Sequence, residues 1–263
     1  MAEKFGKNEI EKNLHCRVLK NEICFFDEID STNLEAIRRA EQGLVIVADK
    51  QNAGRGSHGR SWYSEKNVGI YLTFTLIGGI APDLAFSLPI LTALCISRAI
   101  DRIAGVNTMI KWPNDILLNG KKICGILAET DIKNNSLNSM VVGAGINVNN
   151  TVFPGDISSK ASSVIMGSGE LIDRNILCSE IINELDEAIF CFLQDRNLNR
   201  WIDTYNGRLI HYNRRIDILK GDKRECVCSK GINNKGQLQV VKMNGLEEYI
   251  SLGEVSVRGD GIY

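Results

Sequence analysis

The sequence predicts an α+β protein in which a large part with helices and strands is followed by a small all-β part. Up to residue 208, apolar stretches with helical spacing alternate with shorter apolar runs that are typical of strands. Asn119-Gly120 joins two such runs, which is a strong signal for a tight β-hairpin. From residue 209 onward, only short strands separated by turn residues occur. We therefore expect two domains, 1–208 and 209–263, the second of about the size of an SH3 barrel.

Local patterns predict the elements of the larger domain in order. Thr32 and Glu35 have the spacing of a capping box, which predicts a helix through about residue 42. Asp173 is expected to cap a long helix over 176–193, whose apolar residues form one stripe. The remaining expected elements are a helix-prone segment at 1–20, strands at 23–26, 44–48, 68–76 and 140–148, a turn at 78–82, and helices at 84–103 (with Pro89 in its first turn) and 200–205. In the smaller domain the expected strands are 215–219, 226–230, 237–241, 249–251 and 255–257.

The hairpin at 108–130 is the most informative segment of the chain. Lys111-Trp112 ends one extended run, residues 113–115 turn the chain, and strands at 116–118 and 123–128 flank Asn119-Gly120. Gly125 interrupts the second of these strands, and such a glycine usually marks a close approach by a ligand or another backbone. A cation at Lys111 beside a backbone gap at Gly125 indicates a site for an anionic ligand.

The loop at 49–61 is rich in glycine and arginine. Its segment 54–59 matches the literal pattern G-x-G-x-x-G, but no helix follows as a dinucleotide-binding fold requires, and no kinase motif occurs downstream. Arg55 and Arg60 supply planar donors, and the glycines expose backbone N–H groups. We interpret the segment as a phosphate-binding loop, with a solvated surface loop as the alternative.

Two further segments allow both a structural and a functional interpretation. At the start of the helix at residue 32, Ser31 and Asn33 are free to line a pocket even if Thr32 acts as a cap. Gly143, Gly145 and Asn147 share one face of the strand at 140–148. Those glycines fit either a close strand contact, as at a subunit interface, or a site in which Asn147 contacts a nucleotide or a metal.

Composition excludes several classes of protein. The chain is 44% hydrophobic, with a net charge of −1 and a pI near 6.3, which argues against binding nucleic acid or an anionic membrane over the whole surface. Its 8 cysteines form no C-x-x-C pair, and no secretory signal opens the chain, so we expect reduced thiols in a cytoplasmic protein. The longest apolar stretch, 84–100, is too short and too interrupted to span a membrane. No Cys/His spacing suggests zinc.

Taken together, the motifs resemble those of the biotin protein ligases. The matching segments are DSTN at 30–33, QNAGRGSHGRSW at 51–62, KWPNDILLNGKKICGIL at 111–127 and GAGIN at 143–147, while GINNKGQL at 231–238 fits the family's C-terminal domain. The resemblance spans about residues 24–260. It implies a class II synthetase-like catalytic domain, with a mixed sheet flanked by helices, joined to a small SH3-like β-barrel.

The resemblance also implies the chemistry. Members of the family join biotin to ATP, giving biotinyl-5′-AMP and pyrophosphate, and pass biotin to one lysine of the biotin carboxyl carrier domain of a carboxylase. We therefore expect biotin as substrate, ATP and Mg²⁺ as co-substrate and counterion, and neither a tightly bound prosthetic group nor a metal held by the protein. Only about 24 residues precede the resemblance, too few for the DNA-binding winged helix of many bacterial members, so we expect no DNA partner and no membrane partner. A homodimer is left open.

Site residues follow from the family motifs, position by position. Lys111 and Arg55 are the expected catalytic residues, because two cations in one cavity can offset the repulsion between the biotin carboxylate and the α-phosphate. The expected biotin contacts are Ser31, Thr32, Asn33, Gln51, Gly54, Arg55, Gly56, Ser57, Lys111 and Gly125. On the nucleotide side, the expected contacts are Arg60, Trp62 and Asn147.

One departure from the family pattern lies in the glycine-rich loop. The family loop usually reads G-R-G-R-x-G-R, and this chain has Ser57 in place of the second arginine. Our hypothesis is that losing this donor weakens retention of biotinyl-AMP, which would then leak and acylate nearby lysines. Compensation by His58 or Arg60, and whether Ser57 is natural or engineered, are left open.

Three alternatives are weighed against biotin ligation. Lipoate–protein ligases share the architecture and the acyl-adenylate chemistry, but the KWPND and GRG segments favour biotin. A non-enzymatic biotin sensor would bind the vitamin without releasing pyrophosphate. A purely structural β-domain protein leaves the glycine-interrupted strands and the arginine loop unexplained.

Overall fold

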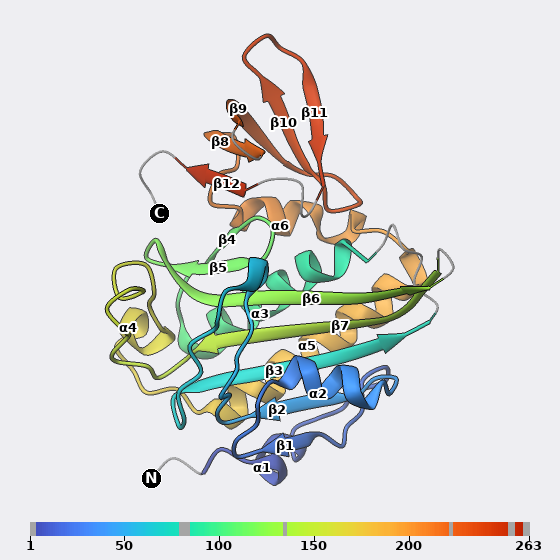
Figure 1. Cartoon of the computed structure of the whole chain (residues 1–263), viewed down its shortest axis with the longest axis vertical. Helices are drawn as coiled ribbons and strands as arrows, with labels where there is room; N and C mark the ends of the chain where they lie inside the picture. The colour runs from blue at the N-terminus through green and yellow to red at the C-terminus, as the bar shows by residue number, and fades with distance from the viewer. Residues whose placement is uncertain (1–3, 79–84, 134–135, 221–222, 252–255, 260–263) are drawn as a thin grey trace.

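A seven-stranded sheet and a five-stranded sheet carry the fold of this computed structural model, which describes residues 4–78, 85–133, 136–220, 223–251 and 256–259. The larger sheet has the order β1-β2-β3-β7-β6-β5-β4 (Figure 1). Its strands are β1 (Cys24–Phe26), β2 (Val45–Ala48), β3 (Gly69–Ile77), β4 (Met109–Lys111), β5 (Asp115–Leu118), β6 (Lys121–Lys133) and β7 (Ser136–Asn147). The β1–β2 pair is parallel and all the other pairs are antiparallel, so the expected mixed sheet is confirmed.

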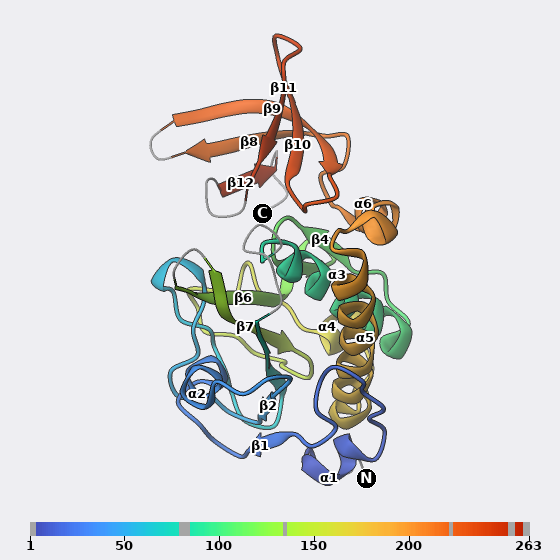
Figure 2. The same ribbon diagram turned by 90° about the vertical axis from the view of Figure 1, so that its right-hand side faces the viewer.

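Helices cover both faces of this sheet. On one face, α3 (Ser87–Ala104) and α5 (Arg174–Asp195) pack against each other, and α2 (Thr32–Arg39) lies on the other face (Figures 1 and 2). The strand β2 shows why both faces must be covered. Val45 and Val47 point into the large core under α3 and α5, whereas Ile46 points into a small core under α2. The predicted stripe of α5 is buried in the large core, and Asp173 caps this helix as predicted.

Short helices complete the larger unit. These are α1 (Lys7–Glu11), α4 (Val164–Ser168), α6 (Ile202–Arg208) and the 3₁₀ turns η1 (Ser57–Gly59) and η3 (Asn199–Trp201). Within the part of the chain that the structure describes, no helix is long and apolar enough to cross a membrane.

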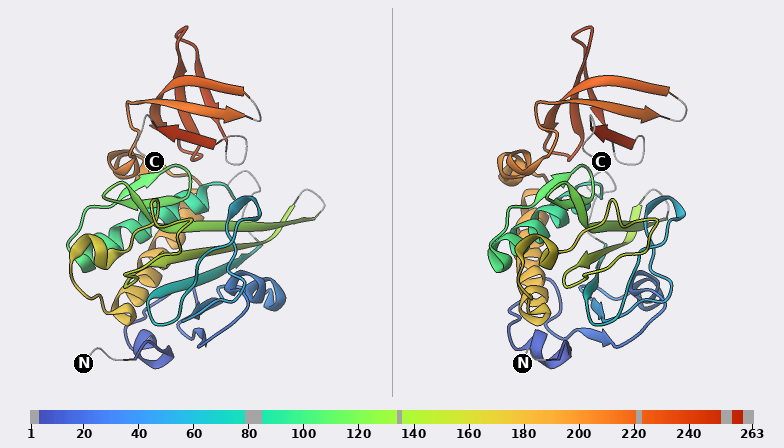
Figure 3. Two further views of the ribbon diagram at one scale, coloured as in Figure 1. Left: turned by 60° about the vertical axis from the view of Figure 1, so that its left-hand side comes forward. Right: turned by 90° about the vertical axis from the view of Figure 1, so that its left-hand side faces the viewer.

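The smaller sheet is antiparallel and lies beyond β4, β5 and α6, as Figures 1 and 3 show. Its order is β11-β10-β9-β8-β12, and every strand predicted after residue 209 is present, although residue 255 lies outside the described residues. The strands are β8 (Arg215–Lys220), β9 (Lys223–Ile232), β10 (Leu238–Lys242), β11 (Glu247–Ile250) and β12 (Ser256–Gly259). The α+β class is therefore confirmed. The division at 208/209 stays a prediction, since Ile210 N donates to Ile110 O across it at 2.9 Å.

The central hairpin has the predicted turn. Leu118 pairs with Lys121, and both turn residues have positive φ, 51° at Asn119 and 76° at Gly120, as a type I′ turn requires. The strands β6 and β7 run further than predicted, because they continue to pair with each other beyond the apolar residues that marked them in the sequence.

Four local predictions need correction. The capping box is wrong: Ser31 occupies the N-cap position of α2 without a capping hydrogen bond, and Glu35 pairs with Arg38 and Arg39. Helix α2 ends at Arg39 rather than near residue 42, because Ala40 adopts a left-handed conformation with φ 47°. Of the segment 1–20, only Lys7–Glu11 is helical among the described residues. Helix α3 starts at 87 rather than 84, and residue 84 and most of the turn predicted at 78–82 lie outside the described residues.

Candidate functional site

A small cavity, here called the first cavity, lies on the face of the sheet that α2 covers. The N-terminus of α2, the strands β6 and β7 and the glycine-rich loop all contribute to its wall. Its lining residues are Ser31, Thr32, Asn33, Gln51, Arg55, Gly56, Ser57, Trp62, Asn114, Lys122, Gly125, Ile126, Leu127, Gly143, Ala144 and Gly145.

One part of the wall is a network of neutral polar side chains. Gln51 Oε1 accepts hydrogen bonds from Thr32 N at 2.9 Å and from Thr32 Oγ1 at 3.1 Å, and Gln51 Nε2 donates to Ser64 Oγ at 3.0 Å. Behind them, the Thr73 hydroxyl lies 2.8 Å from both Thr32 Oγ1 and Asn33 Oδ1. Thr32, Asn33 and Thr73 are buried, so this wall is set in place before any ligand arrives.

The glycines of the sheet make room for side chains that line the cavity. A Cβ at Gly143 would lie 1.9 Å from Asn33 Oδ1, and one at Gly145 would lie 2.1 Å from Trp62 Nε1. A Cβ at Gly125 would lie 2.9 Å from both the Trp62 ring and Lys122 Nζ. The close approach predicted at Gly125 is therefore real, and the groups that approach are protein side chains.

Trp62 and Lys122 form the polar and cationic centre of the first cavity. The Lys122 ammonium lies 5.2 Å from the centre of the Trp62 ring and 2.6 Å from Asp115 Oδ1. The Trp62 indole N–H is buried and has no hydrogen-bond partner among the described residues. A buried donor without a partner is rare in proteins.

The guanidinium of Arg55 is paired within the protein. Arg55 Nη1 lies 3.0 Å from Glu129 Oε1, and Glu129 Oε2 accepts a hydrogen bond from Asn33 Nδ2 at 2.9 Å. The carboxylate thus connects the glycine-rich loop to the start of α2.

A second, larger cavity of about 350 Å³ adjoins the first. Ser57, Asn114, Ile126 and Leu127 line both cavities. Three basic side chains also line the second cavity, namely those of His58, Arg60 and Lys111. Val257 from β12 contributes to its wall. Asp115 lines this cavity and binds Lys122 of the first, so Lys122 lies where the two cavities meet.

Comparison with known proteins supplies the family. The model of the biotin/lipoate A/B protein ligase family matches residues 25–147. The chain is 30% identical over 236 residues to a biotin–[acetyl-CoA-carboxylase] ligase of Mycobacterium tuberculosis, covering 86% of this chain and 85% of that protein. The chain belongs to the biotin/lipoate A/B protein ligase family.

Two further likenesses are informative. The chain is 38% identical over 177 residues to the bifunctional ligase/repressor BirA of Bacillus spizizenii, a match that covers 65% of this chain and 54%, about half, of that protein's length. The biotin protein ligase of Aquifex aeolicus, solved in complex with biotin and ATP, superimposes with a TM-score of 0.79 at 26% identity, covering 90% of this chain and 99% of that one.

Most of the residues carried over from the family meet in the first cavity. Those that line it are Ser31, Thr32, Asn33, Gln51, Arg55, Gly56, Ser57, Gly125 and, from the nucleotide set, Trp62. Arg55 lines the first cavity, and Lys111, with Arg60, lines the adjoining second cavity. That Arg55 and Lys111 serve one site stays a prediction. Gly54 lines neither, although its carbonyl accepts from Trp62 N at 2.8 Å. Asn147 also lines neither and donates through Nδ2 to Ser162 O at 3.0 Å.

Sequence reasoning missed Lys122, and the strand geometry explains why. In a regular strand, residues 121, 123 and 125 share one face, which would place Lys122 on the face opposite Gly125. The pairing register shifts, however, so that Cys124 lies opposite Ile116 while Lys122 lies opposite Leu117. The unpaired residue between them is a β-bulge, which reverses the alternation and brings Lys122 to the face of Gly125.

Proposed function

We propose that the protein is an ATP-dependent biotin protein ligase. It would activate biotin as biotinyl-5′-AMP and transfer the biotinyl group to one lysine of a biotin carboxyl carrier domain. The observation that carries the proposal is the pairing of neutral hydrogen-bonding groups and cations in one cavity. Thr32, Asn33 and Gln51 suit an uncharged ureido ring, and Arg55 and Lys122 suit a carboxylate and a phosphate.

In the first step, a biotin carboxylate oxygen would attack the α-phosphorus of ATP, and the bond to pyrophosphate would break. Both reactants are anions, so the protein's task is to hold them together and to stabilise the charge that develops on phosphorus. We assign this role to Lys122, because its ammonium lies where the two cavities meet. Arg60 and Lys111 in the second cavity would face the triphosphate tail.

In the second step, the neutral amine of the acceptor lysine would attack the acyl carbon. The bond from that carbon to the phosphate oxygen breaks, AMP leaves, and the amine loses its proton. Neither step needs a protein nucleophile, so the chemistry depends on positioning and charge.

Magnesium would enter with ATP as part of the substrate. No group of three or more His, Cys, Asp or Glu side chains that could hold a metal ion occurs in the described part of the chain. Asp115, which lines the second cavity, is paired with Lys122, and Glu129 is paired with Arg55. This supports a metal held by phosphate oxygens and water, as magnesium commonly is.

Ser57 is proposed to weaken the retention of biotinyl-AMP. It lines both cavities, where a second loop arginine would add a bidentate donor. Arg60 donates to the carbonyl and hydroxyl oxygens of Ser57, each at 3.1 Å.

Pyrophosphate release from MgATP tests the proposal. We expect release that depends on biotin and a faster turnover when a carrier domain is added. Lipoate at equal concentration serves as the comparison, because the matching family includes lipoate ligases. A stronger response to lipoate would favour that alternative, and biotin binding without any pyrophosphate would favour a sensor.

A further inference from the structure

Asp49 and Arg174 form a buried ion pair at the base of the glycine-rich loop. Asp49 directly follows β2, and Asn67 lies two residues before β3. The residues between them, 50–66, include Gln51, Arg55 and Trp62 of the first cavity. Contacts at this base therefore decide how the two ends of the loop are held.

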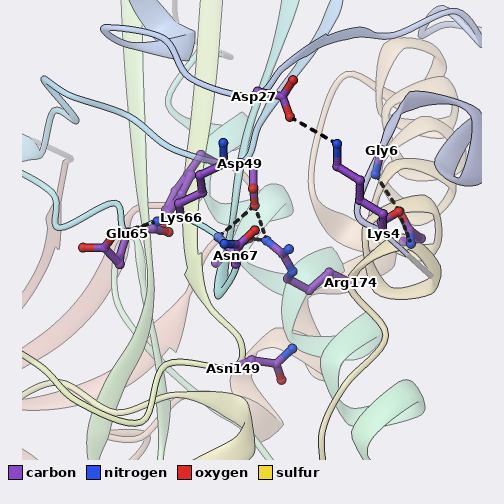
Figure 4. A network of polar contacts seen from close by, with 12 residues as sticks. Lys4, Gly6, Asp27, Asp49, Glu65, Lys66, Asn67, Asn149 and Arg174 are labelled. Carbon is purple, nitrogen blue, oxygen red and sulfur yellow. Dashed lines mark hydrogen bonds and ion pairs between the residues drawn. The ribbon is translucent and has the colours of Figure 1, made fainter. Parts of the chain in front are cut away.

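One oxygen and one nitrogen atom join the two ends of the loop to α5. Asp49 Oδ1 accepts a hydrogen bond from Asn67 N at 3.1 Å and from Arg174 Nη1 at 2.5 Å. The same Nη1 also donates to Gly69 O at 2.9 Å. Figure 4 shows Arg174 reaching Asp49, with Asn67 beside them. The chain that enters the loop and the chain that leaves it are thus bound to each other and to a rigid helix.

Burial makes this pair strong. The side chains of Arg174 and Asp49 are only 10% and 6% exposed, and the guanidinium lies 4.3 Å from the centre of the Phe5 ring. Charges shielded from water interact more strongly than surface pairs do. A buried charge that loses its partner is unfavourable, so the two side chains hold each other in one arrangement.

Backbone hydrogen bonds within the loop connect its base to the wall of the first cavity. Above the ion pair, Gln51 N donates to Ser64 O at 3.3 Å. Further along, Trp62 N donates to Gly54 O at 2.8 Å and Gly56 N donates to Arg60 O at 2.7 Å. Backbone hydrogen bonds therefore join the two sides of the loop along its length. A shift at its base would displace Gln51 and Trp62 in the cavity wall.

We propose that Asp49 and Arg174 are positioning residues that set how tightly the loop holds biotin and its adenylate. This inference rests on the proposed function and deepens it. Neither residue lines the first or the second cavity, so their effect must pass through the loop.

Two variants separate positioning from simple structural support. Asp49→Asn keeps an oxygen that can accept from Asn67 N but removes the charge, and Arg174→Gln removes the cation. In each we expect the KM for biotin and the release rate of biotinyl-AMP to rise about tenfold, with kcat changed by less than about threefold. Arg174→Lys keeps the charge and should lie close to the wild type. Arg208→Gln is the matched control, because it breaks the partly buried Arg208–Asp101 pair away from the loop.

A readout that needs no activity keeps the inference testable in every case. Trypsin cleavage after Arg55 and Arg60 reports loop opening in the ligand-free protein, and we expect it to be faster in Asp49→Asn than in the wild type and Arg208→Gln. Equal cleavage rates together with unchanged KM and release rates in the folded variants would overturn the inference. Should the wild type show no biotin-dependent pyrophosphate release, the proposed function fails and the cleavage comparison alone decides. If Asp49→Asn and Arg174→Gln do not fold, Asp49→Glu takes their place, because it keeps the charge but displaces the carboxylate from Asn67 N and Arg174. Cleavage of Asp49→Glu equal to that of the wild type then counts against the proposal.

Discussion

Trp112 Nε1 donates a hydrogen bond of 3.0 Å to Gly236 O, and this bond joins the larger sheet to the turn between β9 and β10. Trp112 is buried between Lys111 and the turn that carries Asn114, both of which line the second cavity. Gly236 has φ 79°, and a Cβ there would lie 3.1 Å from Ile90. Since Val257 of β12 also lines the second cavity, the C-terminal unit forms part of the site's surroundings.

Trp112→Phe should loosen this junction while keeping an aromatic ring. Gly236 O would lose its donor in a buried place, so we expect the free energy of unfolding to fall by about 1–3 kcal/mol. The KM for ATP should rise more than the KM for biotin, because the second cavity is the one affected. Denaturant unfolding and the two KM values measure this, with Trp201→Phe as a control for the loss of an indole. A larger effect on biotin would show that the junction does not act through the second cavity.

Lys122→Met and Lys111→Met distinguish the two candidate cations. We expect the rate of adenylate formation to fall about 10²–10³-fold in Lys122→Met, because the lost charge faces the reacting groups. Lys111→Met should mainly raise the KM for ATP. Single-turnover formation of biotinyl-AMP at saturating ATP measures the difference. If Lys111→Met gave the larger loss in rate, the original expectation for that residue would be restored.

The comparison of these two lysines shows what the sequence can and cannot predict. A continuous apolar run predicts β2, apolar periodicity predicts α5, and Asn119-Gly120 predicts the hairpin turn, because each of these signals is local. The position of Lys122 depends on a bulge, and no pattern in the sequence marks the register shift opposite Ile116. Lys111 ends β4, as the extended run in the sequence predicts.

Thr32 illustrates a second limit. The capping box is predicted from two residues three apart in the sequence. In the structure, the backbone N–H and the hydroxyl of Thr32 instead donate to Gln51, which is 19 residues away. Tertiary hydrogen bonds of this kind override a local signal. The same bonds build the neutral wall of the first cavity, so the local prediction failed where the candidate site is assembled.

Ser57→Arg should lengthen the lifetime of bound biotinyl-AMP. An arginine at 57 would line both cavities and add a planar donor to the loop. We expect release to slow by about tenfold, the effect of one charge-assisted hydrogen bond. Displacement of labelled adenylate by excess unlabelled biotin and ATP measures it. His58→Arg is the control, since it adds the same group one residue further along and lines only the second cavity. Equal lifetimes for Ser57→Arg and the wild type would end the leakage hypothesis.

The buried imidazole of His211 lies at the junction of the two units, and we expect it to make the stability of the protein depend on pH. Burial and, to a smaller extent, the charge of Lys111 lower the pKa of its imidazole to about 4. Nδ1 lies 3.1 Å from Ser229 Oγ, and Nε2 has no partner among the described residues. The folded protein therefore holds a neutral ring over a range of pH in which the unfolded chain binds a proton.

The sign of the effect follows from that difference. Above pH 6.5, the ordinary value, both states are neutral and His211 adds no pH dependence. As the pH falls from 6.5 toward 4, protonation favours the unfolded chain, so stability is lost by up to about 3 kcal/mol. We expect His211→Gln, which cannot take up a proton, to show a shallower loss over this range than the wild type. Denaturant unfolding at several pH values measures both proteins, with His15→Gln as an exposed control. Parallel curves for wild type and His211→Gln would mean that the ring is already protonated in the folded protein or reaches solvent.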